Sequence, residues 1–114
     1  MSKATHQALY EKLKEVARAR GKIPYSELAS LVGLNQRRLG PLLQEICRYE
    51  HGQDRPMLSV VAVRKQSGIP AKPFFDLAHD LGTCKADNNL DFFVAELQKV
   101  HDYWSSYQLR GVNS

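Results

Sequence analysis

Two segments with an apolar stripe, separated by only about three residues, constrain the fold of this chain most strongly. The segments Tyr25 to Val32 and Asn35 to Tyr49 both repeat apolar residues at the spacing of an amphipathic helix. Gly33 interrupts the pattern, and Asn35 is a residue type that caps helix starts. Pro41 must lie near the first turn of its helix, which would place the helix start a few residues after Asn35. Two helices joined by so short a glycine-containing turn are typical of a helix-turn-helix.

Apolar spacing and residue type also predict elements on both sides of this pair. Leu9 begins a stripe at i, i+4, i+7 and i+8, which predicts a helix that ends before Gly21. The stretch from Met57 to Val63 is rich in β-branched residues and predicts a strand, whereas Pro70 and Pro73 limit how a return strand can pair. The expected elements outside the pair are a helix over 5–20, strands over 57–63 and 69–72 around a turn at 66–68, and helices over 74–81 and 90–107.

This order of elements indicates a fold class. Three helices followed by a β-hairpin form a winged helix-turn-helix, in which the hairpin is the wing. We therefore predict an α+β, mostly α fold: a winged helix-turn-helix of three helices plus a β-hairpin, with two C-terminal helices. Residues 1–82 would form the winged helix-turn-helix domain, and residues 83–114 a C-terminal helical extension packed on it. A chain of 114 residues suits a single domain overall.

Charge is divided unevenly along the chain. Residues 1–72 carry a net charge of +7 and residues 73–114 a net charge of −3, within a total of +4. A basic N-terminal part favours a polyanionic partner such as nucleic acid. The alternative is that these charges belong to helix faces that contact only solvent.

The composition also bears on the compartment. No apolar run approaches the roughly 18–20 residues that a membrane span needs. The segment Met1 to His6 lacks the apolar stretch of a secretory signal, and the chain has two cysteines. Few cysteines without a secretion signal are typical of a reducing compartment. We therefore expect a cytoplasmic protein with no membrane partner and no disulfide framework.

The second helix of a helix-turn-helix places its N-terminal residues in the major groove of DNA. Amide and guanidinium groups, which pair with the edges of adenine and guanine, occupy that position here. Two cations at a helix start are unfavourable for the helix dipole and therefore favour a bound anion, although they can also simply face solvent. The predicted groove-reading residues are Asn35, Gln36, Arg37 and Arg38, and the predicted backbone-contacting residues are Lys22, Gln44, Arg48, Arg64, Lys65 and Lys72.

Part of this region resembles the winged-helix DNA-binding domain of the DNA alkylguanine alkyltransferases. The residues that carry the resemblance are Ile23-Pro24-Tyr25-Ser26-Glu27-Leu28-Ala29, Val32-Gly33 and Arg37-Arg38-Leu39-Gly40, within residues 23–68. The resemblance implies that Arg37 enters the duplex in place of a flipped base and that Tyr25 lies near the flipped nucleotide. It also implies that the helix lies in the minor groove, which reverses the choice of groove made above, and both choices stay open.

The resemblance does not extend to the alkyltransferase reaction. The family carries Pro-Cys-His-Arg before a valine-rich strand, whereas this chain has Pro56-Met57-Leu58-Ser59. Met57 replaces the acceptor cysteine, so alkyl transfer is not implied. The chain also resembles, over most of its length, a group of short bacterial proteins with the same runs around Tyr25, Leu58 and Phe74, and this likeness implies no particular activity.

Other catalytic chemistry is incompletely represented. Cys84 lies near His79 and could act as a nucleophile, but no second ligand pair completes a zinc site. Glu50 and Asp54 precede the predicted strand as the acids of a nuclease would, although the acid-x-Lys pattern is missing before Lys65. We therefore expect no enzyme activity, no metal and no cofactor, and we keep an enzyme that uses these residues as a third hypothesis.

The last predicted helix carries aromatic residues on more than one face. Neighbouring residues of a helix point about 100° apart, so a single buried stripe cannot cover all of them. The predicted partner surface consists of Phe92, Tyr103, Trp104 and Tyr107, facing a second copy of the chain or another protein. The leading hypothesis is non-catalytic binding of double-stranded DNA, either regulatory or damage-sensing. The alternative is a winged-helix protein-interaction module that docks through this last helix.

Overall fold

The computed structural model describes residues 3–83 and 89–113, with side chains described over 7–83 and 89–105. The described part is mostly helical with a small β component, as the sequence predicts. Its α-helices are α1 (Lys3–Arg18), α2 (Tyr25–Leu31), α3 (Gln36–Gly52), α4 (Lys72–Asp80) and α5 (Asn89–Asn113). The shorter elements are strands β1 (Ile23–Pro24) and β2 (Ala62–Val63) and the 3₁₀ helix η1 (Leu58–Val61).

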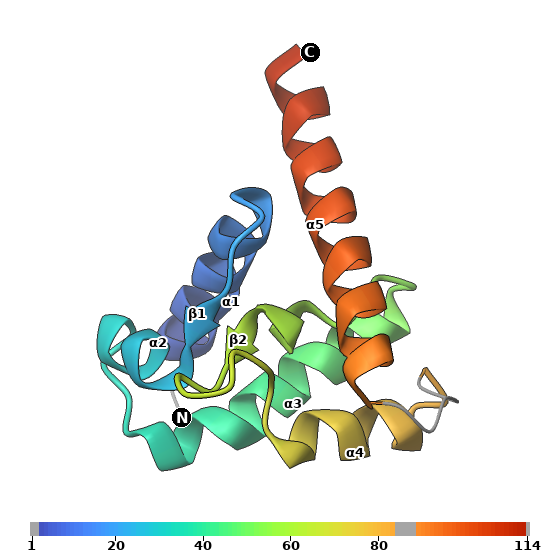
Figure 1. Cartoon of the computed structure of the whole chain (residues 1–114). Coiled ribbons are helices and arrows are strands. Elements are labelled where there is room, and N and C mark those ends of the chain that lie inside the picture. The colour runs from blue at the N-terminus through green and yellow to red at the C-terminus, as the bar shows by residue number, and fades with distance from the viewer. Residues whose placement is uncertain (1–2, 84–88, 114) are drawn as a thin grey trace.

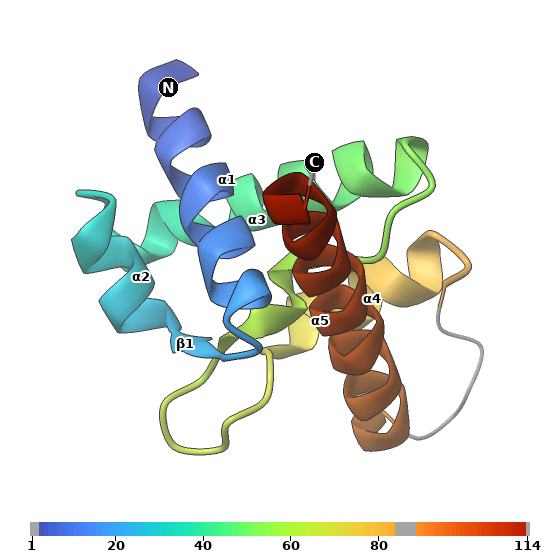
Figure 2. The same ribbon diagram turned by 90° about the horizontal axis from the view of Figure 1, so that it is seen from above.

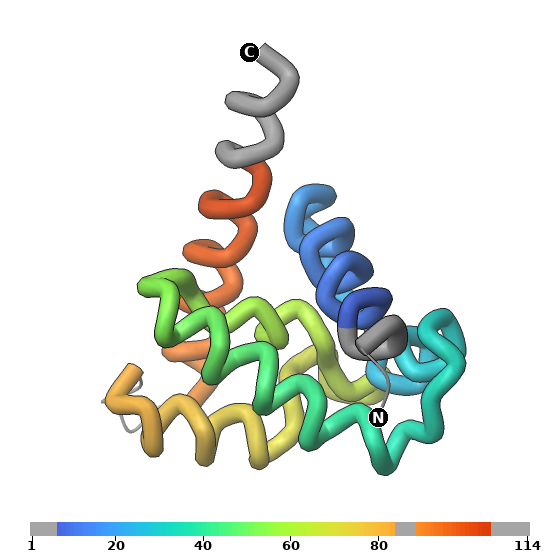
Figure 3. The backbone as a smooth tube through the Cα atoms, turned by 180° about the vertical axis from the view of Figure 1, so that it is seen from behind, coloured from blue at the N-terminus to red at the C-terminus, as the bar shows by residue number. Residues whose placement is uncertain are grey.

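Two of the helices, α3 and α4, lie next to each other, and α1 and α5 extend away from them on one side (Figure 1). Figure 1 shows α3 and α4 along the bottom of the view, with α1 and α5 rising from them and α2 at one end. Seen from behind, α3 and α4 run alongside each other (Figure 3). The short helix η1 is buried at the centre, where it contacts α1, α3 and α5. None of the described helices combines the length and apolar character needed to cross a bilayer.

One continuous core holds these elements together. Leu9 and Leu13 of α1, Ile46 of α3 and Val100 of α5 are all fully or almost fully buried in it. The helix α1 follows the apolar stripe that begins at Leu9, because burying that stripe is the main stabilisation available to an amphipathic helix. The C-terminal helix α5 therefore contributes to the same core as the N-terminal helices.

The predicted hairpin is not formed in the described residues. Residues 58–61 make the helix η1, and β2 pairs in parallel with β1, with Ile23 opposite Ala62. A hairpin joins two antiparallel strands that are neighbours in sequence, whereas β1 and β2 are parallel and far apart in sequence, so this pair is not a hairpin. The segment Leu58 to Val63 is fully buried, with η1 against α1, α3 and α5 and β2 against β1, so the strand predicted over 57–63 is confirmed only at β2. The strand expected over 69–72 is replaced by an irregular run into α4, because Pro70 and Pro73 lack the N–H groups that a ladder needs.

A closed loop takes the place of the wing. The Gly68 N–H donates to the Arg64 carbonyl at 2.8 Å, and the Arg64 N–H donates to the Ile69 carbonyl at 2.9 Å. The backbone of Gly68 has a φ of +72°, which glycine adopts without strain. This confirms the turn predicted at 66–68. Figure 2 shows the loop, residues 64–71, projecting from the rest of the fold.

The connection between α2 and α3 follows the sequence closely. Gly33 has a φ of +72° between α2 and α3, and the Leu34 N–H closes the end of α2 by donating to the Ala29 carbonyl at 2.8 Å. The helix α3 begins directly at Gln36, so the later start predicted from Pro41 is wrong. Proline removes only the hydrogen bond to the carbonyl four residues earlier, which lies in the exposed first turn where water can replace it.

Candidate nucleic-acid interface

The start of α3 presents polar and cationic side chains to the surface. The Asn35 side-chain oxygen accepts a hydrogen bond from the Arg37 backbone N–H at 2.9 Å. Asn35 is therefore the N-cap of α3, and this bond fixes where the helix begins. Gln36, Arg37 and Arg38 are exposed on the first turn. The structure thus brings the four predicted groove-reading residues together, with Asn35 engaged in capping.

Two other predicted DNA contacts hold the 64–71 loop in place. The Ala71 N–H donates to the Tyr25 hydroxyl oxygen at 2.9 Å, and Lys22 donates to the Gly68 carbonyl at 3.0 Å. Burial raises the pKa of Tyr25 above its usual value, against the opposing effect of the Ala71 hydrogen bond. Tyr25 therefore stays protonated at neutral pH, and its own O–H remains a donor.

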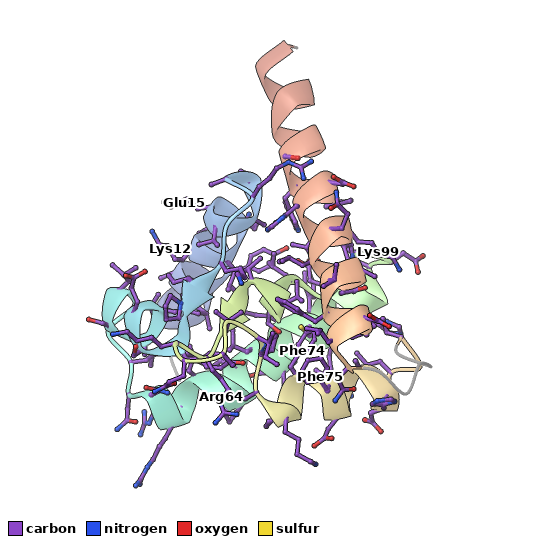
Figure 4. The ribbon with its side chains drawn as sticks, in the orientation of Figure 1. Lys12, Glu15, Arg64, Phe74, Phe75 and Lys99 are labelled. Carbon is purple, nitrogen blue, oxygen red and sulfur yellow. The ribbon has the colours of Figure 1, made fainter. Side chains whose placement is uncertain are left out.

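An open cleft of about 590 Å³ lies between the 64–71 loop and the helices α2 and α3. Gln36 of α3, Arg64 and Lys65 of the loop, and Lys72 at the start of α4 all line this cleft. Figure 4 shows Arg64 beside α3, on the opposite side of the molecule from the tips of α1 and α5. We use the name basic face for Gln36, Arg64, Lys65 and Lys72, which line this cleft, together with the exposed Arg37 and Arg38 that follow Gln36 on the first turn of α3.

Most cations of the basic face lack a carboxylate partner. Arg37, Arg38, Arg64 and Lys65 form no ion pair with any described side chain, whereas Lys72 pairs with Asp76 at 2.9 Å. Cations elsewhere in the described part are mostly neutralised by ion pairs; these are Lys12, Lys14, Arg20, Arg48, Arg55 and Lys99. Unpaired positive charge is thus concentrated at the start of α3 and in the adjacent loop.

The two predicted contacts further along α3 lie elsewhere. Gln44 is two helical turns beyond Gln36 and is half-buried between α3 and α4. Arg48 pairs with Asp80 at 3.3 Å and so links α3 to the end of α4. Both residues lie outside the basic face.

The predicted partner surface is corrected in part. Trp104 is only 5% exposed and packs between α1 and α5, with the Lys14 ammonium 5.9 Å from its ring centre, so it belongs to the core. Phe92 is half-buried, with its ring 6.0 Å from that of Phe74, and Tyr103 is 38% exposed. The side chain of Tyr107 lies outside the described residues.

The exposed apolar residues of α5 are ones that the sequence reasoning missed. Leu90 is 54% exposed and Val94 is 59% exposed, one turn apart on α5. Leu90 and Val94 are spaced i, i+4 and lie beside the buried stripe that contains Phe93, and this spacing could have indicated a second apolar strip on the helix.

Glu50, one of the two candidate acids, and Cys47, one of the two cysteines, both lie in the interior of the fold. Glu50 is fully buried and forms an ion pair with Arg55, so it is not presented to a substrate. Cys47 lies 2.9 Å from the Ser59 hydroxyl, and burial raises the pKa of its thiol to about 11, so it stays in the thiol form. Cys84 lies outside the described residues. Within the described ranges, His, Cys, Asp and Glu side chains form no group of three that could hold a metal ion.

Two buried polar residues of α5 were not found from the sequence. Glu96 accepts a hydrogen bond from the Met57 N–H at 2.8 Å, and His101 Nε2 lies 2.9 Å from the Gly21 carbonyl. Because a carbonyl only accepts, His101 donates from Nε2. Both bonds satisfy backbone groups that lie far from α5 in sequence, so no local pattern could have indicated them.

No family model, curated protein or solved structure matches this chain. The resemblance to the alkylguanine alkyltransferases therefore rests on the residues within 23–68 alone.

Proposed function

We propose that this chain binds double-stranded DNA without catalysing a reaction on it, through the basic face. The observation that carries the proposal is the contrast in ion pairing: Arg37, Arg38 and the loop cations have no described carboxylate partner, whereas most cations elsewhere do. Cations that have no carboxylate partner within the chain are available to pair with an anion of a binding partner. A row of DNA phosphates supplies that anion, and the release of its counterions favours binding.

The parts of the basic face have different tasks in this proposal. Gln36 and Arg37, on the first turn of α3, have the side chains that read base edges. Arg64 and Lys65 project on the loop and contact the phosphate backbone, as a wing would. Tyr25 and Lys22 act indirectly, because their bonds to Ala71 and Gly68 hold the loop beside α3. Both a regulatory and a damage-sensing role use this surface, and in the second Arg37 enters the duplex as the alkyltransferase resemblance implies.

Salt dependence gives the proposal a quantitative test. Each neutralised phosphate contributes about 0.9 to the steepness of the slope of log affinity against log salt. The four cations of the basic face that have no described ion-pair partner, each neutralising one phosphate, therefore give a slope of about −3.6. Between ~50 and ~200 mM salt, this slope corresponds to a roughly 150-fold loss of affinity. We would measure it by fluorescence anisotropy with a labelled random-sequence duplex of about 24 base pairs.

A matched pair of variants separates the basic face from net charge. Arg37→Ala/Arg38→Ala removes two charges from the face and should reduce the steepness of the salt slope by about 1.8. Lys12→Ala/Lys99→Ala removes two charges from α1 and α5, away from Arg64 (Figure 4), and should leave the slope almost unchanged. If the wild type does not bind at low salt, or if the two double variants weaken binding equally, the proposal is wrong.

The alternative function is protein interaction through α5. The exposed Leu90 and Val94 favour it, because apolar side chains at this spacing form one contact strip. Binding through this strip should persist as salt rises, whereas binding to phosphates should not. Val94→Glu should abolish a partner's binding and leave DNA binding unchanged.

A further inference from the structure

A second hollow, of about 180 Å³, lies between α3 and α4. Its walls are the apolar side chains of Leu39 and Leu43 from α3 and Phe74 and Leu77 from α4, all of which are buried against solvent. No charged side chain lines it among the described residues. The hollow is open to solvent on one side, where Gln36, Gly40 and Pro73 are exposed, so a small molecule can reach its apolar wall.

Gly40 also lines this hollow, and it directly precedes Pro41. It lies in the interior of α3, where glycine is less favourable than alanine by roughly 1 kcal/mol. Gly40 is not among the glycines with positive φ, and a Cβ built there would meet nothing within 4 Å. A residue before proline is disfavoured in helical backbone because its Cβ meets the proline ring, so glycine is favoured at this position of α3. The missing side chain also leaves this part of the lining uncovered.

Neutral polar side chains also line the hollow, next to its apolar wall. Gln36 and Gln44 lie two turns apart on the same face of α3, and Gly40 lies midway between them. The Tyr25 hydroxyl also lines the hollow and keeps its own O–H as a donor. A charged ligand would lose its hydration without gaining a counter-charge, whereas a neutral one can use these groups at its edge.

The size and lining of the hollow select the class of ligand. A dry engineered cavity of about 150 Å³ in another protein binds benzene. The present hollow is slightly larger, and the Phe74 ring in its wall offers an aromatic contact. We propose that the hollow between α3 and α4 binds a small uncharged aromatic molecule of one or two rings with a polar edge. This proposal does not rest on the DNA-binding function.

The test uses indole as the probe and the full-length chain, labelled with ¹⁵N. Titration followed by amide shifts should give saturable changes centred on Gly40, Leu43 and Leu77. Gly40→Ala adds one methyl group to the opening, in space that can accept it, and should weaken indole binding roughly tenfold. Gly40→Leu fills the opening and should abolish the saturable changes.

Gly52→Leu is the matched control. It replaces the last residue of the same helix, where a Cβ also meets nothing within 4 Å, and Gly52 does not line the hollow. Indole affinity should match the wild type in this variant. The proposal is overturned if indole causes no saturable shifts, if the shifts centre elsewhere, or if Gly40→Ala binds indole as the wild type does.

Discussion

The ion pair between Arg55 and Glu50 should control the stability of the fold. Glu50 is fully buried on α3, and Arg55, 21% exposed, is its cationic partner. Burial, and then the nearby Glu50 carboxylate, raise the pKa of Tyr10 above its usual value. Glu50 Oε1 has no hydrogen-bond partner in the described part of the chain, so Arg55 supplies the main compensation for the buried charge. Arg55→Met keeps the apolar stem that packs at the site and removes the charge, which leaves Glu50 buried without its cationic partner.

The size of the effect follows from burial. Removing one partner of a buried ion pair costs about 3–5 kcal/mol, because an uncompensated charge is left behind. Arg55 is partly exposed and Tyr10 remains in place, so we expect the lower end, about 3 kcal/mol. Domains of this kind are stable by only about 5–15 kcal/mol, so the loss should lower Tm by roughly 10–20 °C.

Urea and thermal unfolding followed by circular dichroism would measure this loss, with two comparison variants. Glu50→Gln/Arg55→Met removes both charges and should recover most of the stability. Arg20→Met breaks the exposed pair between Arg20 and Asp102 and should cost much less stability than Arg55→Met, because solvent screens exposed charges. The reasoning is refuted if Arg55→Met costs no more than Arg20→Met, or if the double variant is less stable than Arg55→Met.

Three further predictions follow from single contacts. The Arg20 guanidinium, 2.7 Å from Asp102, holds the pKa of that carboxyl below its usual 3.8. The pair therefore stabilises the fold above pH 3.8, and this stabilisation is lost as the pH falls through the lowered pKa of Asp102. Arg20→Ala should raise the Asp102 pKa, which a carboxyl NMR titration would measure. An unchanged Asp102 pKa would contradict this. In a variant where Cys47 is the sole cysteine, a thiol reagent at pH 8 should react only after denaturant is added, because the thiol is buried. Rapid reaction of the reagent with the folded protein would contradict this. Gly33→Ala should destabilise the fold by about 1 kcal/mol, because alanine is strained at a φ of +72°. Gly52→Ala at the end of α3 should instead stabilise it by up to about 1 kcal/mol, and chemical denaturation should give these opposite signs.

Where the sequence predicted the fold well, the signal was local. The Asn35 cap and the Gly33 turn set the ends of α2 and α3, and these signals act over a few residues. The apolar stripe from Leu9 located α1 to within two residues at each end, for the same reason. Helix periodicity and capping need no knowledge of the rest of the chain.

The hairpin and the partner surface could not be predicted in this way. The run Leu58 to Val61 has β-branched residues, yet three helices surround it and it forms η1. Propensity does not report what covers a segment, and burial overrides it. Trp104 is buried and Val94 is exposed because of which side of α5 packs against α1 and η1, and this packing is a tertiary property.

The composition of the basic face was determined by the sequence alone, since Arg37, Arg38, Arg64 and Lys65 were all identifiable as cations near a helix-turn-helix. Only the tertiary structure decided which cations are unpaired. Arg48 meets Asp80 and Lys22 meets the Gly68 carbonyl because the fold brings segments 32 and 46 residues apart into contact. The hollow beside Gly40 likewise exists only once α4 packs on α3. Charge is a property of each residue, whereas its neutralisation and the space around it depend on distances that only the folded chain sets.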